Sequence, residues 1–486
     1  MDDAGDVRVT VRNERPERAG GRFVVYWMIA SRRVRANRAL ARAVDAARRL
    51  GVPLVILEAL RADYRWANDR LHQFVIEGMA DNANALAGQP VTYWPYVEPA
   101  IGAGKGLLEA LSADACLIVT DDYPCFFLPR MVATAAARVP VRLEAVDSNG
   151  LLPMRATDRA FPTAFSFRAY VQRTVRPHFA SWPGAISFDG LASPAPLPPS
   201  IAARWPATPA AELADPARLV AALPIDHSVA AAPIRGGAVS ARRALDRFVN
   251  LRLTMYADAH SHPDLEGTSG LSPYLHFGHL AATDVFDAVM TAEGWTSRQI
   301  APGSGGRREG WWGASRSAEA FLDQLVTWRE LGFNLCVTEP AHAQYRSLPV
   351  WARATLDFHA ADRRPYIYSR RRFEQAATHD PVWNAAQRQL TRDGWMHNYL
   401  RMLWGKKILE WTPAPDEALE TMIEVMNRFA LDGRDPNSYS GYTWTLGRYD
   451  RPWPPERPVV GTIRYMSSTN TVKKLKIKQY LDKYRD

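Results

Sequence analysis

The 16 tryptophans of the chain are concentrated in its second half, which holds 11 of them. Trp404 and Trp411 are seven residues apart, so a helix would place both on one face, about two turns apart. Two indoles so placed can border one cofactor or pass an electron between them. Packing in the core remains the plainer interpretation of any single ring.

The segment Thr268–Gly278 (TSGLSPYLHFG) carries small hydroxyl residues directly before an expected helix. Backbone N–H groups and hydroxyls in this position can bind a phosphate. The same residues also serve as an ordinary helix cap. Taken alone, the segment leaves both interpretations open.

The formal net charge of +9 fits a polyanionic partner, and it also fits a basic surface that favours solubility. The three cysteines, Cys116, Cys125 and Cys336, are too few for a disulfide framework and indicate a reducing compartment. No CxxC or HExxH pattern occurs, so we expect no metal site. No apolar run has the length of a membrane span, and residues 1–22 are polar, which predicts a loose tail.

Short apolar runs alternate with helical patterns from Phe23 to about residue 180, which predicts an α/β domain with a parallel, Rossmann-like sheet. The expected strands are Phe23–Met28, Leu54–Leu57, Val91–Pro95, Ala115–Thr120 and Val139–Ala145. No GxGxxG motif follows the first run, so the sequence does not support a dinucleotide site here. Residues 181–237 are rich in Pro and Ala and are interpreted as a surface linker or a disordered tether.

Residues 238–486 have helical spacing throughout and predict an all-α C-terminal domain. The expected helices are Ala241–Tyr256, Ala281–Ala292, Ala318–Cys336, Pro381–Leu390, Met396–Trp411 and Asp416–Phe429. A loop rich in Gly, Ser and Arg, Ala301–Ser317, interrupts them, and its role does not follow from its composition.

Three segments in this half share long motifs with a known family. They are TSGLSPYLHFG, then EAFLDQLVTWRELGFNLC at Glu319–Cys336, and then Trp383–Met466, with WNAAQRQL, MHNYLRMLWGKKILEW, LDGRDPNSYSGYTW and DRPWPPERPVVGTIRYM. In order and spacing they resemble the class II cyclobutane-pyrimidine-dimer photolyases. VVYWMIASRRVRANRAL and GLLPMRATDRAFPTAFSFR match the family more loosely.

The resemblance implies that the helical domain holds FAD. Tyr256 and the segment Thr268, Ser269, Gly270, Leu271 and Ser272 would hold its phosphates. Arg401 and Asp432 would form an ion pair beside the isoalloxazine ring, with Asp435 near the ribityl chain and the ring edge. A purely structural ion pair is the alternative interpretation of Arg401 and Asp432.

The resemblance also implies roles for the tryptophans. Trp404 would lie nearest the flavin, Trp383 would relay electrons towards the surface, and Trp411 would be a further or alternative donor. Trp328 and Trp444 would flank a pyrimidine dimer extruded from damaged duplex DNA, and Met402 would line the floor of that cavity. Apolar walls suit a flipped base.

Two positions depart from the family pattern. Gln324 stands where the family has the second of two consecutive carboxylates, the one that contacts the dimer in the family. An amide can donate a hydrogen bond but cannot supply a proton. Asp323 is its neighbour and would point elsewhere on a helix. Met426 stands where the family has an asparagine near flavin N5, unless a one-residue shift brings Asn427 there. A thioether is only a weak acceptor.

Three functions follow from this pattern. The leading one is repair of cyclobutane pyrimidine dimers in DNA by blue-light-driven electron transfer from reduced FAD. The others are a cryptochrome-like light sensor and a photoenzyme acting on another lesion or a small molecule. The family's N-terminal domain can also hold an antenna chromophore, often a deazaflavin, and the loose matches leave that open here. We expect a cytoplasmic, monomeric protein.

Overall fold

The computed structural model describes residues 6–194 and 196–485. The chain divides into two compact units, each built from several stretches. The first contains residues 1–157, 177–245 and 271–287, and the second contains residues 158–176, 246–270 and 288–486. Within the described residues, no helix combines the length and the apolar character needed to cross a membrane.

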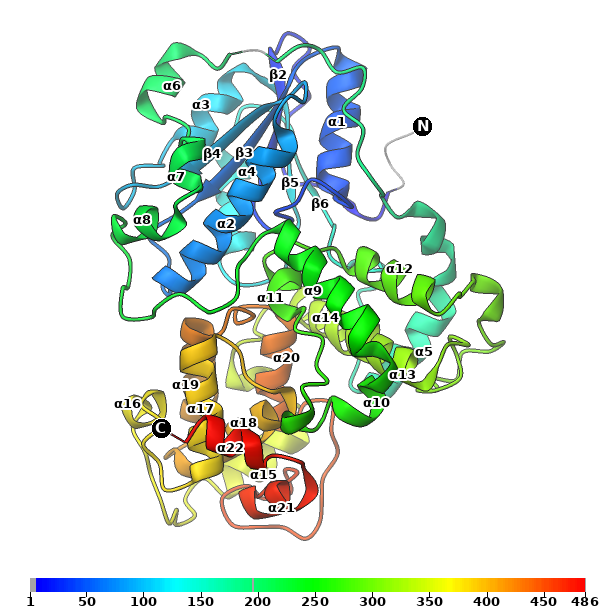
Figure 1. Ribbon diagram of the computed structural model, residues 1–486, viewed down its shortest axis with the longest axis vertical. Coiled ribbons are helices and arrows are strands. Elements are labelled where there is room, and N and C mark those ends of the chain that lie inside the picture. The colour runs from blue at the N-terminus through cyan, green and yellow to red at the C-terminus, as the bar shows by residue number, and fades with distance from the viewer. Residues whose placement is uncertain (1–5, 195, 486) are drawn as a thin grey trace. The chain divides into compact units, whose positions relative to one another are not determined.

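The first unit is built on a six-stranded sheet in the order β1-β6-β5-β2-β3-β4 (Figure 1). All neighbouring strands are parallel except β1, which pairs antiparallel with β6. The strands are β1 (Val9–Val11), β2 (Phe23–Met28), β3 (Leu54–Leu60), β4 (Thr92–Val97), β5 (Ala115–Asp121) and β6 (Leu143–Val146). The α/β prediction for this half is confirmed.

Helices between the strands bury the sheet, as continuous apolar strands require. They are α1 (Arg38–Leu50), α2 (Asp69–Leu86), α3 (Leu107–Asp114) and α4 (Leu128–Arg138). Gly51 ends α1 in the left-handed conformation, with φ 64°, which glycine adopts without strain. Alternate residues of β2 and β3, such as Tyr26 and Ile56, pack in one cluster with Leu40 of α1.

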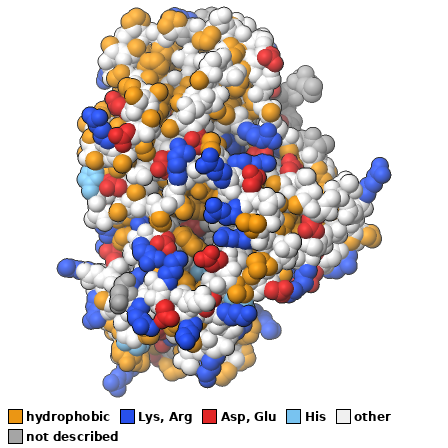
Figure 2. Space-filling model, viewed as in Figure 1, with side chains coloured by type: hydrophobic (Ala, Val, Ile, Leu, Met, Phe, Trp, Pro, Cys, Tyr) orange, Lys and Arg blue, Asp and Glu red, His pale blue; other side chains and the backbone are white. Residues whose placement is uncertain are grey.

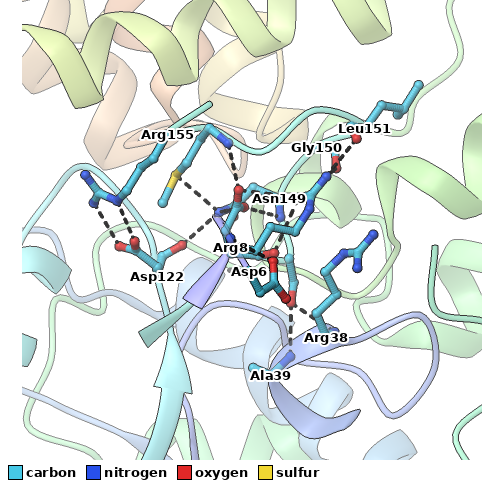
Figure 3. Close-up of polar contacts among 12 residues, drawn as sticks. Asp6, Arg8, Arg38, Ala39, Asp122, Asn149, Gly150, Leu151 and Arg155 are labelled. Atoms are coloured by element: carbon cyan, nitrogen blue, oxygen red, sulfur yellow. Dashed lines mark hydrogen bonds and ion pairs between the residues drawn. The ribbon is translucent and has the colours of Figure 1, made fainter. Parts of the chain in front are cut away.

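The polar N-terminal segment is not a loose tail over its described part, which corrects the prediction for residues 1–22. Val9–Val11 forms the edge strand β1, and Arg8 is 3% exposed. The Arg8 guanidinium pairs with Asp147 at 3.4 Å and donates to the Leu151 carbonyl at 2.7 Å (Figure 3). The Asp147 carboxylate compensates the buried charge of Arg8 inside the unit. A hydrogen bond from the Met154 backbone N–H, at 2.7 Å, holds that carboxylate in place.

The expected linker over residues 181–237 is largely ordered and belongs to the first unit. It contains α6 (Pro199–Arg204), α7 (Ala210–Leu213) and α8 (Pro216–Ala221). Thr208 pairs with strand β4 in both directions: its N–H donates to the Pro95 carbonyl at 2.7 Å and its hydroxyl accepts from the Val97 N–H at 2.9 Å. Apolar side chains of α7 and α8 bury against α2, which explains why a Pro-rich stretch is held in place.

The second unit is helical, as predicted. Its longer helices are α5 (Ala164–Thr174), α13 (Arg316–Leu322), α14 (Arg329–Thr338), α15 (Val350–Phe358), α17 (Pro381–Asp393), α18 (Asn398–Trp411), α19 (Pro415–Phe429), α20 (Pro436–Thr445) and α21 (Ser468–Lys474). The shorter elements include η2 (Leu253–Met255), α10 (Tyr256–Ala259), α16 (Arg370–Glu374) and α22 (Lys478–Lys483). Helices α9 (Ala238–Leu251), α11 (Ser272–His276) and α12 (Ala282–Ala292) lie wholly or partly in the first unit.

Two further features differ from the sequence prediction. Helix α5 was placed in the N-terminal domain, but it belongs to the second unit, where Arg168 pairs with Asp323 at 2.8 Å. The expected single helix Ala318–Cys336 is interrupted by a π-helical turn, η5 (Asp323–Trp328). Such turns often occur at functional sites.

Candidate functional site

Helices α17 and α18 carry the three tryptophans that were predicted to transfer electrons. Asp380 caps α17 and accepts from the Val382 and Trp383 N–H groups at 2.9 and 3.0 Å. The cap sets where the helix begins, and so fixes the direction of the Trp383 side chain. Gly394 ends α17 with φ 76°, and the chain turns back into α18.

The three indoles form one buried cluster. Trp383, Trp404 and Trp411 are 0%, 1% and 2% exposed. The rings of Trp383 and Trp404 are stacked, with centroids 6.2 Å apart, and Trp411 meets Trp383 edge-on at 6.0 Å. The Trp404 ring N–H donates to the Gln387 amide oxygen at 2.8 Å, and that of Trp383 donates to the Trp404 carbonyl at 3.1 Å. The sequence spacing predicted that Trp404 and Trp411 share a helix. The stacked pair, Trp383 and Trp404, instead joins two helices.

Arg401, one turn before Trp404, forms the expected ion pair with Asp432. One guanidinium nitrogen reaches both carboxylate oxygens, at 3.0 and 3.1 Å. The LDGRD turn places Asp432, and it is tightly built: a Cβ on Gly433 would lie 2.5 Å from the Met426 carbonyl oxygen. Arg434, at φ 63°, donates to the Leu431 carbonyl at 3.1 Å and closes the turn. Asp435 is the N-cap of α20 and accepts from the Asn437 N–H at 2.8 Å.

The expected phosphate segment lies just before α11. Thr268, Ser269 and Gly270 belong to the second unit, and Leu271 and Ser272 to the first. Gly270 has φ 70°, which explains the glycine at this position. The Arg252 guanidinium donates to the Thr268 carbonyl at 3.2 Å.

Tyr256 is the first residue of α10 and lies in the second unit, among aromatic rings. Its ring stacks on His260, with centroids 4.7 Å apart, and meets the edge of Phe321 at 5.3 Å. Burial, followed by the nearby Asp323 carboxylate, raises the pKa of Tyr256 well above its usual value. Tyr256 therefore stays a neutral hydrogen-bonding group at physiological pH.

The residues predicted to face the dimer share an intermediate exposure. They are Gln324 and Trp328 on η5, Met402 on α18 and Trp444 on α20. Trp328 meets Tyr449, just after α20, edge-on at 6.4 Å. This contact ties η5 to the chain that follows Trp444.

Two residues at this site were not predicted from the sequence. His397, the N-cap of α18, is 3% exposed, and at least one of its ring nitrogens lacks a hydrogen-bond partner among the residues that the structure describes. Burial, and then His260 and His262, lower its pKa to about 4. Gln387 accepts from Trp404 and is 0% exposed. Within the MHNYLRM motif a histidine before a helix looks like an ordinary polar flank, and only burial distinguishes it.

Comparison with known proteins decides the family. The chain is 32% identical over 478 residues to the deoxyribodipyrimidine photo-lyase of Methanothermobacter thermautotrophicus, covering 98% of this chain and 97% of the relative. It is 31% identical to the rice enzyme, covering 94% of this chain and 86% of that relative. The chain belongs to the deoxyribodipyrimidine photo-lyases. The family resemblance read from the motifs is thereby confirmed.

Solved structures and family models were also compared with the chain. The fold is similar to that of a bacterial class III photolyase from Agrobacterium tumefaciens, with a TM-score of 0.68 at 17% identity, covering 96% of this chain and 86% of that chain. No family model matches the sequence.

The polar groups of the second unit fit the FAD that a photo-lyase implies. Besides a His397 ring nitrogen, Nε of Arg401 is buried without a hydrogen-bond partner in the described part of the chain. Both residues lie at the start of α18, four positions apart and so on one face of the helix. Buried polar groups normally find partners, and a flavin offers acceptors and donors to both. Arg401, with its partner Asp432, and His397 are therefore candidates for contact with the cofactor.

Asp323 cannot replace the carboxylate missing at Gln324. It is 4% exposed and lies between two arginines, at 2.8 Å from Arg168 and 3.4 Å from Arg308. Its charge is used in holding α5 and the loop Ala301–Ser317 to η5. The amide of Gln324 is therefore the group that this part of η5 presents.

Asn427 does not take the place of the asparagine missing at Met426. It is 0% exposed, and its side-chain oxygen Oδ1 accepts from the Arg434 backbone N–H at 2.8 Å and the Tyr442 hydroxyl at 3.2 Å. Its amide nitrogen lies 3.3 Å from the Tyr439 hydroxyl. These bonds commit Asn427 to the turn between α19 and α20, which argues against a one-residue shift.

Proposed function

We propose that this photo-lyase carries FAD and repairs cyclobutane pyrimidine dimers in DNA under blue light. Bound FAD supplies the light absorption and the one-electron chemistry. The observation that carries the proposal is the buried Trp404 ring stacked on Trp383 of α17, with Trp404 on the same helix, α18, as Arg401 and Met402. A stacked pair shielded from water is suited to pass an electron with little reorganisation.

The protein's own groups divide the work. Arg401 and Asp432 hold the cofactor by charge and hydrogen bonds, and Tyr256 and Thr268–Gly270 of the same unit contribute to its phosphate site. Trp404 supplies an electron for photoreduction, Trp383 replaces it, and Trp411 is the further donor. Asp435, the N-cap of α20, anchors the turn that carries Asp432. A deazaflavin antenna, if bound, would belong to the sheet-containing unit, and absorbance beyond the flavin bands of the purified protein tests for it.

The substrate side is formed by Trp328, Trp444, Met402 and Gln324. The two indoles offer flat apolar surfaces for a dimer extruded from the duplex. The amide of Gln324 can donate a hydrogen bond to a dimer carbonyl and so stabilise negative charge on it, without proton transfer. Figure 2 shows Lys and Arg side chains at many points of the surface with Asp and Glu between them, and the formal net charge of +9 suits a polyanion such as DNA.

Binding of DNA with and without a dimer tests this function. We expect tighter binding to a duplex with one thymine dimer than to the undamaged duplex. Trp444→Ala should lose about 1–3 kcal/mol of that preference, the usual range for base–aromatic stacking. Trp295→Ala, in the second unit but outside this residue set, should keep it. Equal affinity of the wild type for both duplexes would remove the repair function.

A second function, light sensing, is favoured by Gln324 and Met426. Both departures fall where dimer chemistry and flavin redox are set, and neither disturbs the stacked tryptophans. A sensor would change shape or partner binding in light. Identical solution scattering in darkness and under blue light would count against it.

A further inference from the structure

Lys406 is a buried cation in the middle of α18, and it is 4% exposed. Its ammonium donates to the carbonyl of Thr445 at 2.7 Å. Thr445 is the last residue of α20, so the ammonium lies at the negative end of that helix dipole. The contact therefore fixes the final turn of α20 against α18.

Trp444 precedes Thr445 on the same turn, and its ring lies under the same ammonium. Nζ of Lys406 is 4.9 Å from the centre of the Trp444 ring, within the range of a cation–π contact. Gly405 shows how closely the helices approach here, because a Cβ at this position would lie 2.6 Å from Cγ2 of Thr445. The dipeptide Gly405–Lys406 thus sets where the Trp444 indole stands.

The surroundings of Lys406 bring its charged and neutral forms close in free energy near pH 7. Burial lowers the pKa of Lys406 to about 7; Asp450 opposes this shift and Arg464 adds to it. Asp450 gives no direct ion pair: its Oδ1 accepts from the Trp453 ring N–H at 2.8 Å, and its buried Oδ2 has no hydrogen-bond partner within the described residues. The carbonyl of Thr445 and the face of Trp444 contact the ammonium directly and favour its charged form, as Asp450 does from a distance.

We propose that Lys406 is a positioning residue for lesion recognition, whose positive charge holds the Trp444 indole in the orientation that stacks on the extruded dimer. The inference rests on the proposed function, in which Trp444 is a wall of the substrate cavity. Both contacts of the ammonium are electrostatic, so a neutral amine loses the cation–π contact and keeps only a weaker hydrogen bond. A purely structural lysine would act through its length and packing, and its effect would not follow its charge.

The proposal predicts a direction for pH dependence. In the free protein the amine is charged below about pH 7 and neutral above it. Lesion binding selects the charged form and so takes up a proton at higher pH. The preference for dimer-containing DNA should therefore fall as the pH rises above 7, towards about tenfold for each pH unit.

The test measures the ratio of affinities for dimer-containing and undamaged duplex between pH 6 and pH 8.5. Three FAD-loaded proteins are compared: wild type, Lys406→Met and Lys407→Met. Lys407 is a matched control because it is buried on the same helix and pairs with Glu410 at 2.6 Å. A fourth protein, Lys406→Arg, keeps the charge at every pH.

We expect the wild-type ratio to fall with rising pH, and the Lys406→Met ratio to be low and independent of pH. Lys407→Met should keep the wild-type ratio and profile, and Lys406→Arg should remove the pH dependence while retaining preference. In a Trp444→Phe background the change Lys406→Met should have a smaller effect. Flavin absorbance and thermal unfolding check that each variant is folded.

A wild type that prefers the damaged duplex with no pH dependence over this range would overturn the inference while leaving the proposed function intact. The same holds if Lys406→Met keeps both the ratio and the profile of the wild type. A wild type that binds both duplexes alike at every pH overturns the proposed function, and the inference with it.

Discussion

The indole rings of Trp383 and Trp404 lie parallel within 7°, with their centres 6.2 Å apart. The two residues are 21 positions apart and lie on α17 and α18. Hydrogen bonds fix both rings, since Trp404 donates to Gln387 and Trp383 donates to the Trp404 carbonyl. The pair is a rigid buried contact along which an electron can move.

Replacing either ring of this pair should slow photoreduction of bound FAD. We expect Trp404→Phe and Trp383→Phe to slow it about tenfold or more, equivalent to about 1.4 kcal/mol or more in the barrier. Loss of the flavin absorbance bands under blue light with an external reductant measures the rate. Trp311→Phe is the control, because Trp311 is 1% exposed and donates to Gly303, outside the stack. Wild-type rates in both relay variants would contradict the electron path.

Breaking the Arg401–Asp432 pair should cost both stability and cofactor. Asp432 is 6% exposed, so Arg401→Met leaves a buried carboxylate without its cation. We expect a loss of about 2–3 kcal/mol, below the range of fully buried pairs because Arg401 is partly exposed. The ratio of flavin to protein absorbance after gel filtration should fall as well. Arg428→Met, which removes a more exposed partner of Glu374, should cost about 1 kcal/mol or less and keep FAD bound.

Asparagine at Met426 should shift the redox behaviour of the flavin. Met426 is 0% exposed and its thioether is a poor hydrogen-bond partner, whereas an amide in its place can bond to the cofactor. We expect Met426→Asn to change the midpoint potential of bound FAD by at least about 30 mV, roughly tenfold in the two-electron equilibrium. Potentiometric titration followed by flavin absorbance measures it. Met422→Asn, one turn earlier and also fully buried, is the control for simple disruption of α19.

Much of the architecture follows from the sequence, and particular residues show where that stops. Apolar runs located β2 to the residue, and helical spacing placed Trp404 and Trp411 on one helix. The stacking of Trp404 on Trp383 could not be predicted in this way, because it depends on how two helices pack. The π-helical turn Asp323–Trp328 changes the hydrogen-bonding register without a residue pattern of its own.

The burial of polar residues is a second feature that the sequence alone does not predict. Val9–Val11 is a short strand in a polar stretch, and only the long-range pairing of Arg8 with Asp147 explains why it is held. His397 and Lys406 look like solvated polar residues in the chain, yet both are buried beside the residues assigned to cofactor and substrate.

The buried imidazole of His279 should make the first unit lose stability in acid. Its Nδ1 accepts from the Gly237 N–H at 2.9 Å, and burial, with nearby Arg32 and Arg33, lowers its pKa to about 3. Below pH 6.5 the imidazole of His279 binds a proton in the unfolded chain but stays neutral in the folded chain. The free energy of unfolding therefore falls by about 1.4 kcal/mol per pH unit as the pH drops towards 3.

His279→Asn keeps an acceptor for Gly237 and removes this titration. We expect the variant to be less stable at pH 7 and to lose less on going from pH 6.5 to pH 5. Urea unfolding of both proteins at the two pH values isolates the difference, because the other titrating groups are shared. Equal losses in the two proteins would show that His279 is not kept neutral.

Repair itself is the most direct test of the account. The photoreduced protein is mixed with an oligonucleotide that carries one thymine dimer, and the dimer is followed under blue light beside the Gln324→Glu variant. We expect the wild type to restore the thymines, at a rate within about tenfold of that of the variant, because the amide still donates a hydrogen bond. A wild type that photoreduces normally and leaves the dimer intact would contradict this expectation and make light sensing the better explanation.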